Sequence, residues 1–254
     1  MRSIPFLDDR FSVRTLYTDN VDWQSHDDWQ LTESRNAVLK KYVNVPVERV
    51  VYAFEVGSSD VLAVTENNIE ELASVKKEDI PGRFGTFDAM VTALPGTMLC
   101  ICTADCLPLF LYEPEKNLAA IAHCGWTGIS GGVVSNTIAV MVERYGADPK
   151  CVVAAIGPGI CERCYEVGGE LKDAFAERFS PDEVECLFMP RQDGKFLLNL
   201  RKAVMLELQH VGVRPEAIHD TGICTYEAEL YPSCRRVGRH IPPKQQTVSG
   251  IVLA

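Results

Sequence analysis

Three apolar segments near the middle of the chain constrain the fold more than any other feature of the sequence. They read FDAMVTAL, TMLCICTADCLPLFLYE and LAAIAH, and the turn-forming sequences PG and PEKN separate them. Runs of β-branched, aliphatic and aromatic residues that are bounded by turns are typical of buried strands. We therefore predict strands at the centre of a sheet, with the PEKN turn joining two of them in a hairpin.

Helical and extended patterns alternate irregularly along the rest of the chain. Extended segments are expected at VERVVYAFEV, DVLAVT, CVVAAIG, ECLFM and KFLLNL, and helices at SRNAVLKKYV, GISGGVVSNTIAVMVERYG, EVGGELKDAFAERF and RKAVMLELQHVG. Irregular alternation favours a mixed α/β (α+β) fold, with a mixed central sheet flanked by helices, over a doubly wound parallel sheet. No stretch rich in Pro, Gly or Ser divides the chain, so we expect residues 1–254 to form a single compact domain.

The charge balance disfavours two classes of partner. The 254 residues include 25 Lys and Arg against 35 Asp and Glu, which gives a formal net charge of −10 at pH 7. Nucleic acids and anionic membrane surfaces attract clustered Lys and Arg, so we expect neither as a partner. No apolar run reaches the ~18–20 residues of a membrane span, and the N-terminal MRSIPFLDDR lacks the apolar stretch of a signal peptide.

The ten cysteines indicate a reducing compartment. Disulfide frameworks are typical of short secreted chains, whereas these cysteines belong to a long acidic chain without a signal sequence. We therefore predict a cytoplasmic protein whose thiols mostly pack as small apolar side chains. Cys161 and Cys164 form a C-x-x-C motif, but it is a weak signal because no second C-x-x-C completes a zinc knuckle.

Reactive side chains concentrate in two segments that follow apolar strands. These are TADCLP, which contains Cys106, and HCGWTG, which begins with His123. If PEKN closes a hairpin, Cys106 and His123 face each other across neighbouring strands. Such a pair can bind zinc or copper, or the imidazole can activate the thiol as a nucleophile, or both can be ordinary buried residues.

Neighbouring residues suggest a binding site for an anion and a planar ring. Glycines at 125, 128, 131 and 132 lie at the start of a predicted helix, where they either expose backbone N–H groups to phosphate or allow tight packing. Trp126 can stack on a ring or cover the core. The GPGICERCYEVGGE segment places Tyr165 at another strand end, and Arg235 and Arg236 either contact phosphate or form ion pairs.

In this order, these motifs resemble the bacterial laccase-domain family, also described as multicopper polyphenol oxidases and as purine nucleoside phosphorylases. The motifs are FDAMVT, TADCLP, HCGWTG, GPGICERCYEVGGE, GICTY and YPSCRR. The resemblance implies a mixed α/β domain with zinc or copper bound by two histidines and one cysteine. It implies phosphorolysis of adenosine, inosine and methylthioadenosine, with adenosine deamination alongside, and an older description implies copper-dependent oxidation of phenols.

Carried onto this chain, the resemblance gives Cys106 and His123 as metal ligands and as catalytic residues. The other histidine is expected in a Gln-Val-His-Gly segment, which here reads Glu55-Val56-Gly57-Ser58. Gly57 therefore stands where the family has a ligand, and the chain is a divergent member that lacks this histidine. Glu55 is a candidate substitute.

The sequence also differs from the family motifs at residues that the resemblance associates with phosphate binding. The arginine of the family's His-Ala-Gly-Trp-Arg-Gly loop is Thr127 here, whereas Arg35 is retained. Loss of an arginine removes a bidentate phosphate donor, so we expect weaker phosphate binding. The residues assigned to substrate and phosphate binding are Arg35, Gly125, Trp126, Gly128, Tyr165, Arg235 and Arg236.

The leading hypothesis is an enzyme that acts on purine nucleosides and phosphate. One alternative is a metal-independent cysteine hydrolase or amidase that acts on a cell-wall precursor through Cys106 and His123. Another is a catalytically impaired protein that binds nucleosides. The missing ligand favours the first alternative over a metalloenzyme.

Overall fold

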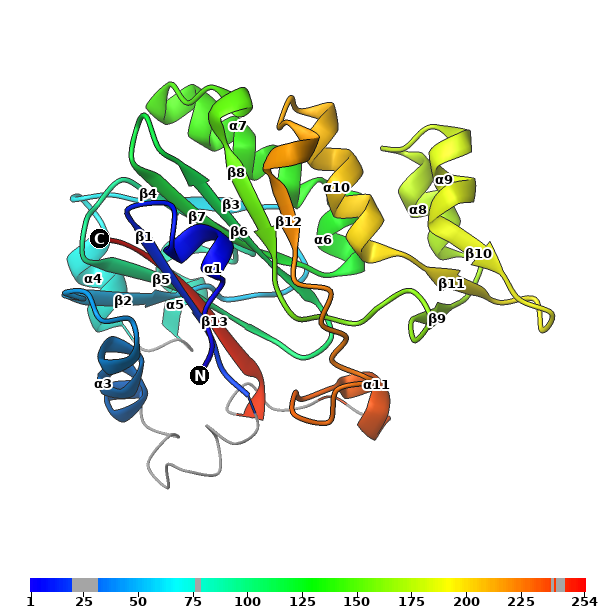
Figure 1. Cartoon of the computed structure of the whole chain (residues 1–254), viewed down its shortest axis with the longest axis horizontal. Helices are drawn as coiled ribbons and strands as arrows, with labels where there is room; N and C mark the ends of the chain where they lie inside the picture. Colours follow the sequence, from blue (N-terminus) through cyan, green and yellow to red (C-terminus); the bar gives the residue numbers. More distant parts are fainter. Residues whose placement is uncertain (20–31, 76–78, 239, 241–244) are drawn as a thin grey trace.

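The computed structural model describes residues 1–19, 32–75, 79–238, 240 and 245–254, without the side chains of 32–35 and 38 (Figure 1). At its centre is a six-stranded mixed sheet with the strand order β12-β8-β6-β7-β4-β3. Its strands are β3 (Val61–Val64), β4 (Ala89–Thr92), β6 (Leu107–Glu113), β7 (Leu118–Cys124), β8 (Val153–Ile156) and β12 (Ile218–Asp220). The predicted hairpin is confirmed, since β6 and β7 pair antiparallel with Pro108 opposite His123.

A four-stranded sheet packs against one face of the central sheet, in the order β1-β13-β5-β2. Its strands are β1 (Val13–Tyr17), β2 (Arg49–Tyr52), β5 (Thr97–Thr103) and β13 (Thr247–Leu253). Leu99 and Ile251 from this sheet share one buried core with Phe110 and Ile121 from the central sheet. The same core includes residues from α1 (Pro5–Asp8), α4 (Ile69–Ser74) and α5 (Ile80–Phe84), whereas α3 (Thr32–Tyr42) packs on the outer face of the small sheet.

Helices cover the opposite face of the central sheet. These are α6 (Trp126–Gly131), α7 (Val133–Tyr145) and α10 (Leu200–His210), visible together in Figure 1. Ile138 and Met141 of α7 and Val204 of α10 are buried in one cluster with Leu109 and Ala120 of the sheet. These layers are the mixed α/β architecture predicted from the sequence, although the strands are divided among three sheets rather than collected in one.

The segment TMLCICTADCLPLFLYE is not one strand. It divides into β5 and β6, which belong to different sheets, and the chain turns between them at Ala104–Cys106. Asp105 adopts a φ of 96°, in the left-handed region that turns require and that non-glycine residues rarely enter. The corner between the two sheets therefore lies directly before Cys106.

Two predictions in the second half were wrong in detail. The expected helix at EVGGELKDAFAERF begins later, as α8 (Leu171–Ala176), because β9 (Glu166–Val167) pairs with β11 (Phe196–Leu198). The segment ECLFM is only partly extended. A capping box between Ser180 and Glu183 starts α9 (Pro181–Leu187), which includes its first three residues and leads into β10 (Phe188–Pro190).

Within the part of the chain that the structure describes, no helix combines the length and the apolar character that crossing a membrane requires.

Candidate active site

A cavity of about 440 Å³ lies at the corner where β6 begins, beside α11 (Cys234–Val237). Three residues predicted from the sequence line it: Cys106, Tyr165 and Arg235. Its other lining residues are Ala104, Asp105, Ile160, Leu200, Cys234 and Gly238. Four segments that are distant in the sequence therefore meet at this cavity, as is typical of a ligand site carried on loops.

Arg235 and Tyr165 form one wall as a stacked pair. The guanidinium carbon lies 5.0 Å from the centroid of the tyrosine ring, and Nη1 donates to the carbonyl oxygen of Glu166 at 2.7 Å. Burial, together with the nearby Cys106 and Asp105, raises the pKa of Tyr165 to about 12 despite the opposing effect of Arg235. Tyr165 is therefore a neutral phenol at pH 7, and Arg235 keeps its positive charge beside the cavity.

Asp105 fixes the corner that presents Cys106. Its buried carboxylate accepts hydrogen bonds from Thr225 Oγ1 and from the backbone N–H of Arg235, both at 2.7 Å. Its backbone carbonyl accepts the N–H of Ile160 at 2.8 Å. One residue with an unusual φ thus holds three walls of the cavity together, which offsets its backbone strain.

His123 is oriented by Asp88, a residue that the sequence analysis did not single out. His123 Nδ1 donates to Asp88 Oδ2 at 2.7 Å. The fully buried Asp88 carboxylate also accepts the backbone N–H groups of Val56 and Gly57 at 3.0 Å and of Ser58 at 2.8 Å. A carboxylate at the start of an apolar strand, as in FDAMVT, needs such partners once it is buried, and this was the available signal.

Cys106 and His123 lie together beside Gly125. A Cβ atom added to Gly125 would lie 3.2 Å from Cys106 Sγ and 3.8 Å from His123 Nε2, so glycine leaves room for the pair. Burial disfavours the imidazolium, but the hydrogen-bonded Cys106 sulfur and the Asp88 carboxylate outweigh it and raise the pKa of His123 well above its usual range. Asp88 therefore contacts His123, and His123 contacts Cys106. A carboxylate, an imidazole and a thiol connected in this order are suited to acid–base or nucleophilic catalysis.

The residues around this pair do not fit the three-ligand metal centre that the sequence resemblance implies. Cys106 and His123 provide two ligands, but Gly57 has a φ of +79°, and a Cβ there would lie 2.3 Å from Thr127 Oγ1. Glu55, the candidate substitute, instead accepts the backbone N–H of Cys102 at 2.7 Å through Oε1. Among the described residues, clusters of three or more metal-ligating side chains occur only elsewhere.

The other predicted residues have different surroundings. Gly128 packs tightly, since a Cβ there would lie 3.2 Å from the carbonyl oxygen of Ser58, and Trp126 is about one-third exposed, at 36%. The Arg236 guanidinium donates to the carbonyl oxygens of Thr225, Tyr226 and Tyr231. Arg35 belongs to α3, but its side chain lies outside the described part of the structure.

The fold and the site define a mixed α/β protein with a small-molecule cavity beside a Cys–His–Asp group. Residues 10–242 match the family described as "Multi-copper polyphenol oxidoreductase laccase". The chain belongs to this family, as its motifs predicted.

Curated relatives in this family carry the names of nucleoside enzymes. The chain is 30% identical over 199 residues to "Purine nucleoside phosphorylase YlmD" of Geobacillus stearothermophilus, which covers 78% of this chain and 71% of the relative. It is 32% identical over 210 residues to "Purine nucleoside phosphorylase SCO2081" of Streptomyces coelicolor, which covers 83% and 79% of the two chains. It is also 33% identical over 153 residues to "Adenosine deaminase RL5" of an unknown prokaryotic organism, with 59% and 57% coverage.

A solved structure shows the same fold. The crystal structure of YlmD from Geobacillus stearothermophilus superposes with a TM-score of 0.81 at 24% sequence identity, and covers 95% of this chain and 92% of that one. This similarity confirms the predicted mixed α/β class.

Proposed function

We propose that this protein is a purine nucleoside phosphorylase. In this reaction an oxygen of inorganic phosphate bonds to C1′ of the nucleoside, the bond from C1′ to the purine nitrogen breaks, and the base leaves with a proton. The products are a purine base and a sugar 1-phosphate. The observation that carries the proposal is the Asp88–His123–Cys106 group at the edge of a cavity lined by Tyr165 and Arg235.

His123 is suited to protonate the departing base. Asp88 holds Nδ1, so the Nε2 edge of the ring faces Cys106, and the raised pKa favours the cationic form of the ring. A proton donor matters because the purine leaves as an anion unless it is protonated in the transition state. Asp88 keeps the ring in the required orientation and stabilises its charge.

Arg235 is suited to bind phosphate. Its guanidinium lines the cavity, stacked on Tyr165, and one of its nitrogens is fixed to Glu166. A planar guanidinium binds phosphate oxygens through two parallel hydrogen bonds, and its stacking limits the conformational entropy that is lost on binding. The phenol of Tyr165 adds a neutral donor on the same wall.

Zinc or copper, the metals suggested for this family, has no role in the proposed steps at Cys106. A catalytic zinc usually needs three protein ligands, and only Cys106 and His123 of the family's set are present here. Gly57 stands at the third position, and Glu55 accepts a hydrogen bond from the backbone N–H of Cys102. We further propose a cytoplasmic location, which the ten cysteines support because thiols persist in a reducing compartment.

The proposal is tested by incubating the purified protein with inosine or adenosine, with and without phosphate. We expect free base and sugar 1-phosphate in equal amounts, and only when phosphate is present. Arg235→Lys serves as the matched variant, because it keeps the charge and loses the planar fork, and its KM for phosphate should rise by about tenfold. Absence of free base with every nucleoside tested would overturn the proposal.

The contact between Cys106 and His123 also favours a second candidate, a cysteine hydrolase or amidase. In that reaction the thiolate attacks an acyl carbon, the imidazolium protonates the leaving amine, and water releases the acyl group. Iodoacetamide distinguishes the two candidates. Rapid alkylation of Cys106 that abolishes amide hydrolysis supports the hydrolase, whereas a Cys106→Ser variant that retains phosphorolysis excludes a nucleophilic role for the thiol.

A further inference from the structure

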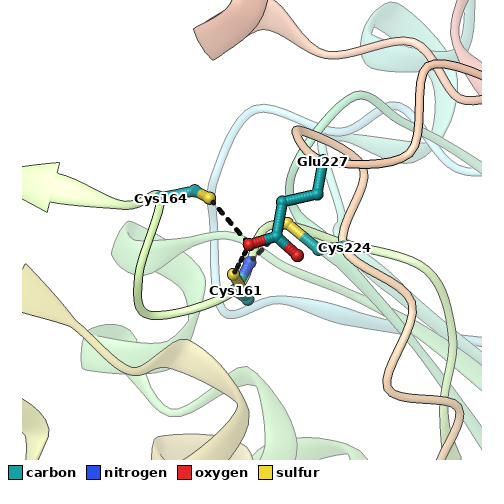
Figure 2. A group of neighbouring side chains, drawn as sticks. All are labelled: Cys161, Cys164, Cys224 and Glu227. Carbon is teal, nitrogen blue, oxygen red and sulfur yellow. Dashed lines mark hydrogen bonds between the residues drawn. The ribbon is translucent and has the colours of Figure 1, made fainter.

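A second group of thiols lies on the loops that border the cavity, separate from Cys106. It consists of Cys161, Cys164, Cys224 and Glu227 (Figure 2). One ligand atom from each side chain lies within 4.8 Å of all the others. Cys161 and Cys224 are buried, Cys164 is partly buried, and Glu227 is exposed, so the group has a buried floor and an open side.

The group is built from two turns with the same spacing. Cys161 and Cys164 form C-x-x-C, and Cys224 and Glu227 form C-x-x-E. The Gly159 N–H donates to the Ile223 carbonyl oxygen at 3.1 Å, and the Thr225 N–H donates to the Gly159 carbonyl oxygen at 3.2 Å, which aligns the turns side by side. The sequence lacks a second C-x-x-C, but the structure places a carboxylate where its second cysteine would be.

A backbone N–H group is directed at one of the sulfur atoms. Cys224 Sγ accepts the N–H of Cys161 at 3.4 Å. A C-x-x turn that directs N–H groups to a sulfur stabilises the thiolate, which is the form that binds metals.

The distances suit tetrahedral coordination. Glu227 Oε1 lies 3.8 Å from Cys161 Sγ and 3.6 Å from Cys164 Sγ, with both thiols directed at the same oxygen in Figure 2. In a zinc site with Zn–S of ~2.3 Å and Zn–O of ~2.1 Å, tetrahedral geometry separates sulfur from oxygen by ~3.6 Å. The ligand atoms therefore need little rearrangement to enclose an ion.

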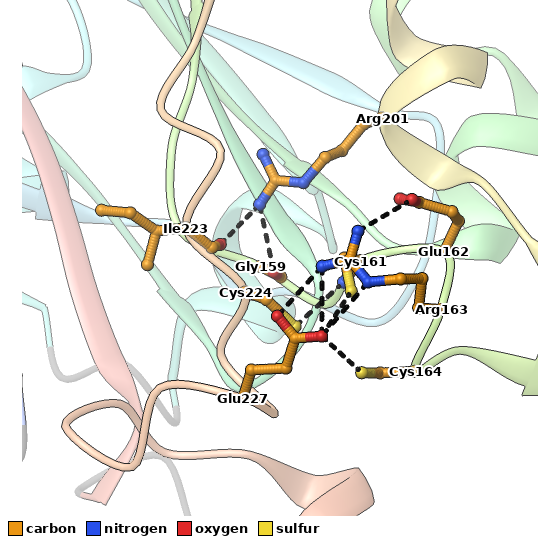
Figure 3. A network of polar contacts seen from close by, with 9 residues as sticks. All are labelled: Gly159, Cys161, Glu162, Arg163, Cys164, Arg201, Ile223, Cys224 and Glu227. Carbon is orange, nitrogen blue, oxygen red and sulfur yellow. Dashed lines mark hydrogen bonds and ion pairs between the residues drawn. The ribbon is translucent and has the colours of Figure 1, made fainter.

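Two arginines hold the frame, and one of them, Arg163, balances part of its charge (Figure 3). Arg163 contacts both carboxylate oxygens of Glu227, with Nη2 3.1 Å from each. The buried Arg201 donates to the carbonyl oxygens of Gly159 at 3.0 Å and Ile223 at 2.6 Å, so it joins the strands that lead into the two turns. Three thiolates and a carboxylate carry a charge of about −4, which a dication and Arg163 reduce, whereas Arg201 is ion-paired with Asp220.

We propose that Cys161, Cys164, Cys224 and Glu227 bind one zinc ion in tetrahedral coordination. Zinc is the divalent ion that thiolate-rich tetrahedral sites select, and it is redox-inactive. When zinc binds, each Cys-Sγ–H and any protonated carboxyl loses its proton to solvent. The ion holds the loop that continues into Tyr165 against the segment that leads to Arg235, and the site is independent of the proposed phosphorylase reaction.

The metal content of purified protein tests this proposal. After reduction, incubation with zinc and removal of excess metal, we expect about one zinc per chain in the wild type and in Cys106→Ser. Cys161→Ser/Cys224→Ser should lose the ion, whereas Cys186→Ser, an exposed cysteine outside the group, should retain it. Loss of the ion from Cys106→Ser, or its retention in the double variant, would overturn the assignment, as would a wild type that binds no zinc.

Cobalt(II) gives a readout that does not depend on removing ligands. Bound to the wild type, it should show thiolate-to-metal charge transfer and the intense visible bands of tetrahedral cobalt. Glu227→Cys should strengthen the charge-transfer band by adding a fourth thiolate, and Glu227→Gln should weaken binding while leaving the circular dichroism spectrum unchanged. An unaltered cobalt spectrum in both variants, or a disulfide between Cys161 and Cys224 in protein purified without oxygen, would contradict the zinc site.

Discussion

The site at Cys106 and the site at Cys161 both combine cysteine with other ionisable side chains, and they differ in the contacts that their donor atoms make. At Cys106, the imidazole of His123 uses Nδ1 to bind Asp88, and Asp88 is in turn occupied by backbone N–H groups. At Cys161, three sulfurs and a carboxylate oxygen converge within 4.8 Å. The first arrangement orients a proton donor, and the second offers a complete set of metal ligands.

This difference shows why a family name does not locate a metal. The family description refers to copper, and the resemblance assigns the ion to Cys106 and His123. Gly57 and Thr127 now occupy the space of the third ligand, whereas the ligand count is complete at a motif that carried only a weak signal in the sequence. Three sulfurs and a carboxylate oxygen converge at Cys161, whereas the site at Cys106 has only two of the three ligands that the family resemblance implies.

The largest effect that we predict concerns the proton donor. His123→Gln keeps the size of the side chain but removes the titratable group, so kcat/KM for inosine should fall by about 10²–10⁴-fold. His210→Gln is the matched control, because His210 pairs with Glu183 on α9, in a different part of the molecule. Initial rates of base release measure both variants, and a loss of less than about threefold in His123→Gln would exclude general acid catalysis by this residue.

Asp88→Asn tests whether Asp88 stabilises the charge on the proton donor His123. The amide can still fill the space and accept one hydrogen bond, but it cannot stabilise the imidazolium, so the variant should lose activity chiefly at higher pH. If Asp88 only holds the loop at Val56–Ser58, the pH profile of kcat/KM will keep its shape.

The strands and the proximity of Cys106 to His123 could be predicted from the sequence because their signals are local. Apolar runs between turn sequences located the hairpin of β6 and β7, and its register brought Cys106 near His123. The division of TMLCICTADCLPLFLYE between two sheets was not predictable in this way. It depends on Asp105, whose left-handed φ is stabilised by Thr225 and Arg235, more than one hundred residues away.

The difference between local signals and long-range contacts also explains which residues of the two sites could not be predicted from the sequence. Asp88 and the C-x-x-E turn of Cys224 lie far from their partners in the sequence, and only tertiary contacts show their roles. The glycines after His123 left phosphate binding and tight packing open as alternatives, and the structure shows that Gly128 packs closely against the carbonyl oxygen of Ser58. A pattern of residue types indicates candidate site residues. Choosing between a structural and a functional role requires the contacts that those residues make in the folded chain.

The next prediction tests the zinc site through stability. If zinc is present at about 1,000 times its dissociation constant, it stabilises the folded chain by about 4 kcal/mol. For a chain of this size that corresponds to a fall in Tm of about 10 °C when a chelator and a reductant remove the ion. Calorimetry should show this fall in the wild type and in Cys106→Ser but not in Cys161→Ser/Cys224→Ser. A chelator effect that disappears in Cys106→Ser would reassign the metal to the first site.

A smaller effect on stability is expected from adding a side chain at Gly57, the position of the family's third metal ligand. Gly57→Ala and Gly222→Ala both place an alanine at a positive φ, which costs about 1–2 kcal/mol. Only Gly57→Ala also meets Thr127 Oγ1, at 2.3 Å, so urea denaturation should show a further loss of about 1–3 kcal/mol in unfolding free energy. Combining it with Thr127→Ala should remove that excess. Equal losses for the two glycine variants would mean that the space at position 57 is open to a ligand.

The smallest predicted effect is the pH dependence of stability from the Asp88–His123 pair. The pKa of His123 is raised in the folded chain, so its contribution is fully present below the unfolded value of about 6.5 and is lost as pH rises through the folded pKa. Burial opposes ionisation of Asp88, but His123 and the loop N–H groups lower its pKa, so its contribution is lost only as pH falls below about 4. The unfolding free energy of the wild type should therefore exceed that of His123→Gln most between about pH 4 and 6.5, and the difference should shrink at higher pH with a slope of at most about 1.4 kcal/mol per pH unit.

Urea titrations at a series of pH values measure this difference, with His210→Gln as the control. Because the Cys106 sulfur is the other main cause of the raised pKa, Cys106→Ser should shift the decline to lower pH. Parallel curves for the wild type and His123→Gln would show that folding leaves the pKa of His123 unchanged, which contradicts a cationic proton donor. A wild-type advantage that instead grows as the pH rises toward about 6.5 would show that the imidazole is neutral in the folded chain.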